Sequence, residues 1–316
     1  MTDPAPPTVD DALARISALL DDAGVPDPRT DSELILAHVL GETRGRIQAL
    51  AVMGRALTAE QAERATELTD ERARRVPLQH LTGRAPFRAL ELSVGPGVFV
   101  PRPETEGVAQ LAIDALLAVP DPEPIAVDLC TGSGAIALSL AREVPTARVW
   151  AVEKSPEAHA WAARNVAEWG EGRVELLLGD VAELALGDVA ELARESTAAP
   201  DPGSATPLAA VAALAGRIDV LASNPPYVPT GMVPRDPEVR DHDPEMALFS
   251  GADGLDLIRV ISRVGRSLVR PGGTLVLEHA EHQGRAIRDI LAADGWRAAA
   301  THPDLTGRDR ATTALS

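Results

Sequence analysis

Strand-like and helix-like segments alternate along the chain from about residue 104 onward. Short apolar runs are typical of buried strands, and amphipathic stretches between them are typical of helices. The runs at 125–129, 147–153, 173–178, 218–222 and 273–278 predict strands, and the stretches at 134–143 and 254–269 predict helices. Ser155 as N-cap and Pro156 at the first position predict the start of a further helix after the second strand. This rhythm predicts an α/β fold with a doubly wound, mostly parallel sheet.

The first quarter of the chain has a different, helical pattern. Thr30–Glu33 and Thr58–Gln61 match the capping-box pattern of helix starts. Gly24 and Gly41 follow apolar periodic segments, where a glycine commonly ends a helix. We therefore expect a disordered tail over 1–10 and a helical domain over 11–84.

Two further segments set the expected domain boundaries. Residues 85–103 contain an alternating run closed by Gly95-Pro96-Gly97, which predicts a β-hairpin linker before the α/β domain of residues 104–316. Within that domain, residues 179–185 are repeated at 187–193 with the same sequence, GDVAELA. The Ala- and Pro-rich residues 194–216 that follow are expected to form a low-complexity surface insertion.

Composition excludes several classes of protein. The formal net charge of −17 over 316 residues argues against free DNA or RNA as the main ligand, because nucleic-acid binding depends on Lys and Arg. The first residues are acidic and proline-rich, without the basic flank and apolar stretch expected of a signal peptide, and no apolar run approaches the roughly 20 residues that span a bilayer. Cys130 is the single cysteine, so an internal disulfide framework is excluded. We expect a cytoplasmic protein.

A glycine-rich turn joins the first predicted strand to its helix. It comprises Asp128 to Gly134, with the sequence DLCTGSG. Glycines let a backbone approach a ligand closely, and a helix start offers free N–H groups. Gly132 to Ala137 also fits the dinucleotide pattern G-x-G-x-x-A, so the turn by itself does not separate NAD from S-adenosylmethionine.

Two acids follow the next two strands. Glu153 ends the second strand, where a carboxylate would accept the ribose hydroxyls of a nucleoside. Asp180 follows the third strand and would accept an adenine amino group. Asp188 has the same local sequence because of the repeat, so the choice between the two stays open, with Asp180 preferred for its position directly after the strand.

The tetrapeptide Asn224-Pro225-Pro226-Tyr227 follows the strand at 218–222. An amide nitrogen is a poor nucleophile, and it needs acceptors that orient it and stabilise developing positive charge. The Asn224 side-chain oxygen and the Pro225 carbonyl would accept its two N–H groups, with the fixed φ of the prolines holding that carbonyl. Tyr227 would offer an aromatic face to a flat amide.

Taken together, these motifs resemble the bacterial peptide chain release factor N5-glutamine methyltransferases, the PrmC or HemK proteins. The similarity covers about residues 10–316, and its most specific part is 100–106, VPRPETE, because NPPY occurs in many amino-methyltransferases. The stretches that carry it are 77–83, 97–106, 130–134, 224–227, 247–255, 271–279 and 304–310.

The resemblance implies a Rossmann-like methyltransferase domain with S-adenosyl-L-methionine as cofactor and S-adenosyl-L-homocysteine as product. The substrate would be the GGQ glutamine of class-1 release factors, methylated at N5, with the helical domain helping to recognise it. From charge and composition we expect no direct binding to nucleic acid or membrane, and we expect a monomer. The implied cofactor residues are Cys130, Thr131, Gly132, Ser133, Gly134, Glu153, Asp180, Val181 and Asn224. The implied catalytic residues are Asn224, Pro225, Pro226 and Tyr227.

This sequence departs from the family pattern at a few positions. Cys130 replaces a glycine of the turn, which a negative φ at that residue would tolerate. His80 stands where tyrosine is common, and Val181 where tryptophan often follows the acid.

Alternatives remain at this point. A glutamine methyltransferase acting on a ribosomal protein would share NPPY, and a DNA adenine N6-methyltransferase would share the chemistry but need a basic recognition region. A binding module without activity is the third. A metal site at Glu278, His279, Glu281 and His282 is not expected, since a committed third ligand is missing and methyl transfer needs no Lewis acid. Arg102 and Glu104 would either border the substrate channel or form structural ion pairs.

Overall fold

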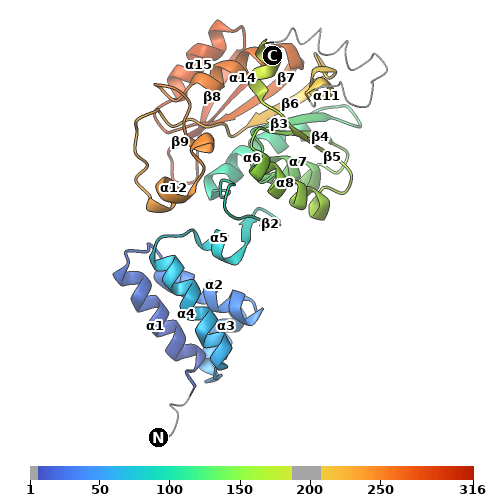
Figure 1. The fold of residues 1–316 in the computed structure, drawn as a ribbon. Helices are drawn as coiled ribbons and strands as arrows, with labels where there is room; N and C mark the ends of the chain where they lie inside the picture. Colours follow the sequence, from blue (N-terminus) through green and yellow to red (C-terminus); the bar gives the residue numbers. More distant parts are fainter. Residues whose placement is uncertain (1–5, 187–207) are drawn as a thin grey trace, which may run out of the picture. The chain divides into compact units, whose positions relative to one another are not determined.

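The computed structural model describes residues 6–186 and 208–316, which form two compact units (Figure 1). The first unit comprises the chain up to Arg84 together with Pro234–His242. The second comprises Ala85–Val233 and Asp243–Ser316. Among the described residues, no helix has the length and apolar character needed to cross a membrane.

The first unit is helical. It contains α1 (Val9–Asp22), α2 (Pro28–Leu40), α3 (Arg44–Val52), α4 (Ala59–Ala73), α5 (Leu78–Thr82) and α12 (Pro237–His242). Thr8, Asp27, Thr43 and Thr58 cap the first four helices through their side chains. Buried residues such as Leu13, Ile35 and Ile47 form one apolar core between these helices.

Two expectations for this unit were wrong in detail. Thr30 does not start a helix, because Asp27 is the N-cap of α2 and Pro28 its first residue. The tail is shorter than expected: Thr8 caps α1 and Val9 is fully buried, whereas residues 1–5 lie outside the described part. The capping box at Thr58 is confirmed.

Helix α12 reaches this unit from the second half of the sequence. Its Glu238 carboxylate accepts hydrogen bonds from Arg72 and Arg75, at distances of 2.7 to 2.8 Å. Arg72 also pairs with Asp31 at 2.7 Å. These paired guanidinium groups hold the pKa of Glu238 down at about 2. Sequence analysis had placed this segment with the continuous α/β domain.

The second unit is built on a seven-stranded sheet of order β5-β4-β3-β6-β7-β9-β8. The strands are β3 (Ile125–Leu129), β4 (Arg148–Glu153), β5 (Val174–Leu178), β6 (Ile218–Ser223), β7 (Val269–Glu278), β8 (Arg297–Pro303) and β9 (Asp309–Leu315). The first five strands in this order, β5-β4-β3-β6-β7, are parallel to one another, and β9 pairs antiparallel with both β7 and β8. The predicted mostly parallel sheet is confirmed.

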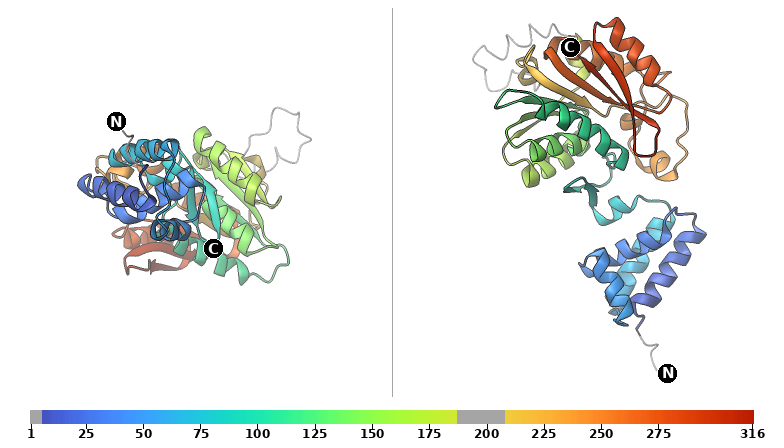
Figure 2. Two further views of the ribbon diagram at one scale, coloured as in Figure 1. Left: turned by 90° about the horizontal axis from the view of Figure 1, so that it is seen from below. Right: turned by 180° about the vertical axis from the view of Figure 1, so that it is seen from behind.

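Helices cover both faces of this sheet (Figures 1 and 2). Alternate strand residues point to opposite faces, so Ala126 and Val220 pack with α6 and α7 while Val127 and Leu221 pack with α14 and α15. The helices of this unit are α6 (Pro103–Leu117), α7 (Ala135–Glu143), α8 (Pro156–Trp169), α9 (Val181–Leu186), α11 (Ala209–Ala212), α13 (Glu245–Leu248), α14 (Asp256–Leu268) and α15 (Gly284–Ala293).

Two short strands precede the sheet. β1 (Arg84–Phe87) and β2 (Leu90–Ser93) pair with each other, as the hairpin prediction required. The expectation that residues 194–216 form a surface insertion is wrong for the end of that range. Leu208, Val211 and Ala212 are buried in the same apolar core as residues of α14, so residues 208–214 belong to the folded domain. Residues 194–207 of the expected insertion lie outside the described part.

Candidate active site

The glycine turn lies at the carboxyl end of β3, where it leads into α7. Gly132 and Gly134 have φ angles of 58° and 88°, in the left-handed region that glycine adopts without strain. Asp128 holds the turn from below, because its Oδ2 accepts hydrogen bonds from the Thr131 hydroxyl at 2.5 Å and the Ala137 N–H at 3.1 Å. Burial raises the pKa of Asp128 to about 7.

Cys130 does not have the negative φ that would let a cysteine replace glycine in this turn without strain. Its φ is 61°, not negative, so the cysteine occupies the left-handed conformation that normally selects glycine. Burial raises the pKa of the Cys130 thiol, and the nearby Glu153 carboxyl acts in the same direction. The thiol is therefore neutral at ordinary pH and unsuited to act as a nucleophile.

Glu153 lies at the end of β4 and is 8% exposed. Its Oε2 accepts the Gly132 N–H and its Oε1 accepts the Ser155 N–H, both at 2.8 Å. Each carboxylate oxygen has a second lone pair, so the pair can still accept two donors from a ligand. Burial raises the pKa of Glu153, and the backbone N–H donors oppose that rise.

Asp180 follows β5 and pairs with Lys154 at 2.7 Å. Its Oδ1 also accepts the Ala182 N–H at 2.9 Å. The Lys154 ammonium lowers the pKa of Asp180, against the opposing effect of burial. Asp188, the alternative left open by the repeat, lies outside the described residues.

Asn224 begins the loop after β6. Its amide nitrogen Nδ2 donates to the Thr105 hydroxyl at 3.3 Å, which leaves the side-chain oxygen as the acceptor for a ligand. Tyr227 turns its hydroxyl to the Glu278 carboxyl at 3.3 Å, and burial raises the pKa of Tyr227. The stacking role of its ring stays a prediction.

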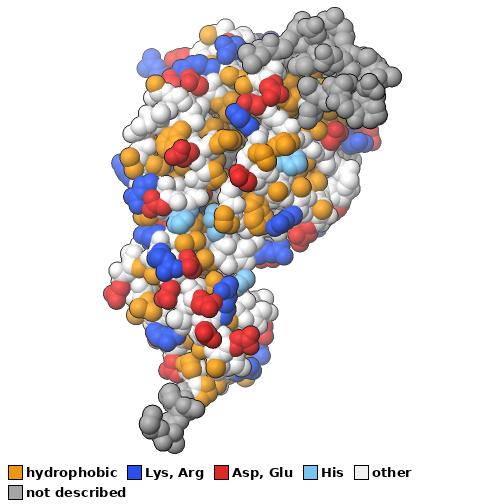
Figure 3. All heavy atoms as spheres, in the orientation of Figure 1, with side chains coloured by type: hydrophobic (Ala, Val, Ile, Leu, Met, Phe, Trp, Pro, Cys, Tyr) orange, Lys and Arg blue, Asp and Glu red, His pale blue; other side chains and the backbone are white. Residues whose placement is uncertain are grey.

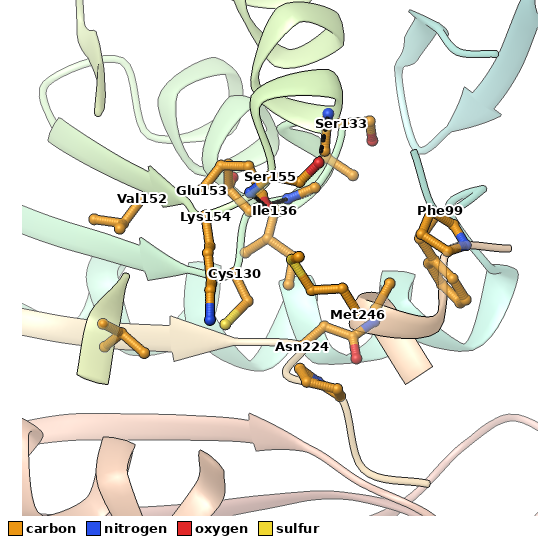
Figure 4. A pocket seen from close by; sticks show the side chains of 18 of the residues that line it. Phe99, Cys130, Ser133, Ile136, Val152, Glu153, Lys154, Ser155, Asn224 and Met246 are labelled. Carbon is orange, nitrogen blue, oxygen red and sulfur yellow. Dashed lines mark hydrogen bonds between the residues drawn. The ribbon is translucent and has the colours of Figure 1, made fainter. Parts of the chain in front are cut away.

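These residues surround one cavity of the second unit (Figure 4). Glu153, Lys154 and Ser155 reach it from the end of β4, Asn224 from the loop after β6, and Phe99 from the segment before α6. The expected site residues on its wall are Cys130, Thr131, Gly132, Ser133, Glu153, Asp180, Val181, Asn224 and Pro226. Gly134, Pro225 and Tyr227 do not line it, although they adjoin residues that do.

Sequence reasoning missed several residues of this wall. Apolar side chains make up much of it, and an apolar side chain by itself gives no sign in the sequence that it contacts a ligand. Phe99, Pro101, Ile136, Val152, Met246 and Leu257 belong to this group. Thr105 was inside a quoted motif, but the spacing of that motif gave no sign that its hydroxyl would meet Asn224.

Arg102, the N-cap of α6, and Glu104 in its first turn both form ion pairs. Arg102 pairs with Asp243 at 2.6 Å and lies over the Phe99 ring, 4.9 Å from its centre. Glu104 is 3.9 Å from Arg308.

Figure 3 shows acidic and basic side chains interspersed over the viewed face of the protein. His279 uses both ring nitrogens, against the Ala280 carbonyl and the Thr312 hydroxyl.

Comparison with known proteins finds two families that match parts of the chain. Residues 11–83 match the PrmC N-terminal domain, and residues 126–193 match a methyltransferase domain. The chain is 48% identical over 305 residues to the release factor glutamine methyltransferase of Streptomyces coelicolor, covering 96% of each protein.

Two other relatives bear the same name. That of Bifidobacterium longum is 42% identical, with 98% of this chain and 99% of that protein covered. That of Mycolicibacterium smegmatis is 41% identical, with 96% of each covered. At this identity over nearly the whole length, the chain belongs to the release factor glutamine methyltransferase family.

Proposed function

We propose that this enzyme transfers the methyl group of S-adenosyl-L-methionine to the N5 amide nitrogen of the GGQ glutamine in class-1 peptide chain release factors. It would act in the cytoplasm, as a monomer. The observation that carries the proposal is the placement of Asn224: its amide nitrogen is engaged by Thr105 while its side chain lies on the wall of the cavity formed by the glycine turn and Glu153.

The donors around the cavity fit this cofactor. Two glycines with φ angles in the left-handed region leave the backbone of the turn accessible to a ligand. The Glu153 carboxylate keeps lone pairs that can accept two ribose hydroxyls. Asp180 and Val181 suit the adenine end, and apolar groups such as Ile136 suit the rest of the ligand. Bound there, S-adenosylmethionine supplies an electrophilic methyl group on a sulfonium.

The chain's own residues orient the acceptor nitrogen. We assign the Asn224 side-chain oxygen to one N–H of the glutamine amide and the Pro225 carbonyl to the other. Both acceptors stabilise the positive charge that grows on nitrogen as the carbon–nitrogen bond forms and the carbon–sulfur bond breaks. One N–H proton then passes to solvent water, and the products are the methylated amide, S-adenosyl-L-homocysteine and that proton.

A labelling assay tests the reaction and the target. Purified, unmodified release factor would be incubated with labelled S-adenosylmethionine, beside a factor whose GGQ is changed to GGA. Label on the first factor only is the expected result. If neither is labelled while calorimetry shows that the cofactor binds, the release-factor assignment is wrong.

The Asn224→Ala variant tests the pair of acceptors assigned above, the Asn224 side-chain oxygen and the Pro225 carbonyl. Losing the acceptor should lower kcat by about 100-fold or more, the size found when one preorganised polar group of this kind is removed. Cofactor affinity, measured by calorimetry, should change by less than about threefold. Normal turnover in this variant would refute the assignment of Asn224 as an acceptor for the substrate amide.

A further inference from the structure

We propose that Thr105 and Glu278 are positioning residues that fix which way the Asn224 amide faces, through a chain of hydrogen bonds in which Asn224 Nδ2 donates to the Thr105 hydroxyl and that hydroxyl donates to the Glu278 carboxylate. This inference rests on the proposed function, because it assigns a purpose to the orientation of Asn224. Neither residue was singled out by the sequence motifs for such a role.

The need for such a chain follows from the Asn224 amide itself. Its oxygen accepts hydrogen bonds and its nitrogen donates them, and the two ends are nearly equal in size. Rotated by half a turn, Asn224 would present N–H groups to the N–H of the substrate, and the interaction would become repulsive. A neighbour must therefore distinguish the two orientations.

Thr105 is the neighbour that meets Asn224, at 3.3 Å from Nδ2. It lies in the first turn of α6, is 4% exposed and lines the same cavity. A hydroxyl both donates and accepts, so Thr105 by itself would accept either orientation of the amide. The direction has to come from whatever takes the hydroxyl proton of Thr105.

Glu278 is the group placed to take that proton. It ends β7 and is 2% exposed, and its Oε1 already receives the Tyr227 hydroxyl at 3.3 Å. Its Oε2 is buried without a hydrogen-bond partner among the described residues. Helix α6, which carries Thr105, packs beside β7, and the Thr105 hydroxyl lowers the pKa of the Glu278 carboxyl. The hydrogen bond from the Thr105 hydroxyl to this carboxylate is the part of the chain that the proposal adds. An ionised carboxylate only accepts, so it draws the Thr105 proton to itself and leaves a Thr105 lone pair for Asn224 Nδ2.

The charge on Glu278 then decides the orientation of Asn224. Burial raises the pKa of Glu278 to about 7, and Glu104 of α6 acts in the same direction. Thr105, the Tyr227 hydroxyl and Arg310 of β9 oppose the rise. Below that pKa, a protonated Glu278 donates to Thr105, and Thr105 can then donate to the wrong end of Asn224.

The sequence offers a direct test by nuclear magnetic resonance, because the chain has two asparagines, Asn165 and Asn224. Protein labelled with nitrogen-15 at asparagine gives two side-chain NH₂ signals. Asn165 is a built-in control: it is fully buried, and its amide bonds the backbone of Ser93 and Ser133. The Asn224 signal should shift with a midpoint near pH 7 while that of Asn165 stays constant.

Three variants of the full-length enzyme extend this test. Thr105→Val keeps the shape but removes the hydroxyl, Thr105→Ser keeps the hydroxyl, and Glu278→Gln removes the titrating charge. The shift of the Asn224 signal should vanish in Thr105→Val and Glu278→Gln and persist in Thr105→Ser. A shift that persists in Glu278→Gln, or is absent from the wild type, would overturn the proposal.

Kinetics supply the second readout. Thr105→Val should lower kcat about tenfold to 100-fold with little change in cofactor KM, and Thr105→Ser should recover to within about threefold of the wild type. Equal losses in both would mean that Thr105 serves packing only. If the wild type shows the resonance shift but methylates no release factor, the hydrogen-bond chain stands and the proposed substrate fails.

Discussion

At the scale of single residues, Cys130 carries the clearest backbone strain in the cofactor turn. A side chain at a φ of 61° brings Cβ close to the following carbonyl, which costs roughly 1–2 kcal/mol. Cys130 lines the cavity. The turn that forms this wall requires the left-handed backbone conformation at residue 130, and the chain adopts it despite the cost. Strain of this kind persists where the surrounding structure imposes it.

Replacing Cys130 with glycine should relieve the strain. We expect Cys130→Gly to be more stable than Cys130→Ala by about 1 kcal/mol, because both lose the thiol but only glycine accepts the left-handed conformation freely. Chemical denaturation of the two variants measures the difference. Equal stability, or an advantage for alanine, would show that the turn is not strained.

Residues of the site differ in how far sequence could predict them. Gly132, Glu153 and Asn224 were predicted because each ends a strand or opens a helix, and strand ends meet at one edge of a parallel sheet. The pairing of Thr105 with Asn224 could not be predicted, since it depends on how α6 packs beside β6. The positive φ of Cys130 could not be predicted, because glycine is the residue that usually adopts this conformation and a cysteine gives no sign of it.

At the scale of elements, the loop after β6 is held by contacts that come from elsewhere in the chain. The Gln283 amide donates to the Tyr227 carbonyl at 2.9 Å and to the Asp253 carbonyl at 3.2 Å. Gly254 allows this approach: its φ is 77°, and a Cβ on it would lie 2.2 Å from the Tyr227 carbonyl oxygen. The loop that carries Asn224 thus depends on a glycine outside it.

Gly254→Ala should therefore impair both folding and turnover. We expect a loss of about 1–3 kcal/mol in the free energy of unfolding, from the clash and the strained φ, and a fall in kcat of about tenfold or more. The matched control is Gly107→Ala, on the exposed side of α6, where a Cβ meets nothing within 4 Å and helix propensity improves. Wild-type stability and kcat in Gly254→Ala would contradict this account.

Elements were predicted better than their arrangement. The five strands from β3 to β7 and the helix opened by Ser155 follow from apolar runs and caps. Strands β8 and β9 were not predicted, because their exposure alternates poorly and they pair as an antiparallel edge. The membership of α12 was missed for another reason: it depends on two arginines about 160 residues earlier in the chain.

At the scale of the whole molecule, the helical unit is assembled from two separate stretches of sequence. Residues up to Arg84 supply its five N-terminal helices, and Pro234–His242 supplies α12. The link is electrostatic and largely buried: Arg72 and Glu238 have side chains that are 7% and 14% exposed. Removing one partner from such a pair leaves the other charge without compensation.

Glu238→Gln should destabilise the helical unit by about 2 kcal/mol at pH 7. The pKa of Glu238 is about 2 in the folded chain and its ordinary value is 4.5, so the stabilisation is complete above pH 4.5 and is lost as pH falls towards 2. The gap between wild type and variant should therefore close over that range. Hydrogen exchange of α1 to α4, read by mass spectrometry, measures it.

Glu67→Gln provides the comparison for this variant. Glu67 pairs with Arg64 on α4, but both side chains are more than half exposed, at 56% and 53%. Its loss should change stability by less than about 0.5 kcal/mol. Equal effects of the two substitutions would mean that the Glu238 pair holds α12 no better than a surface contact does.

The divided helical unit also limits how these enzymes can be recombined. A chimera joined at residue 84 would take Arg72 and Arg75 from one parent. It would take α12, with Glu238, from the other. Unless both parents carry the same pairing, the new protein would combine mismatched charges. A module swap that preserves the unit has to exchange residues 1–84 and 234–242 together, through two replacements in the gene.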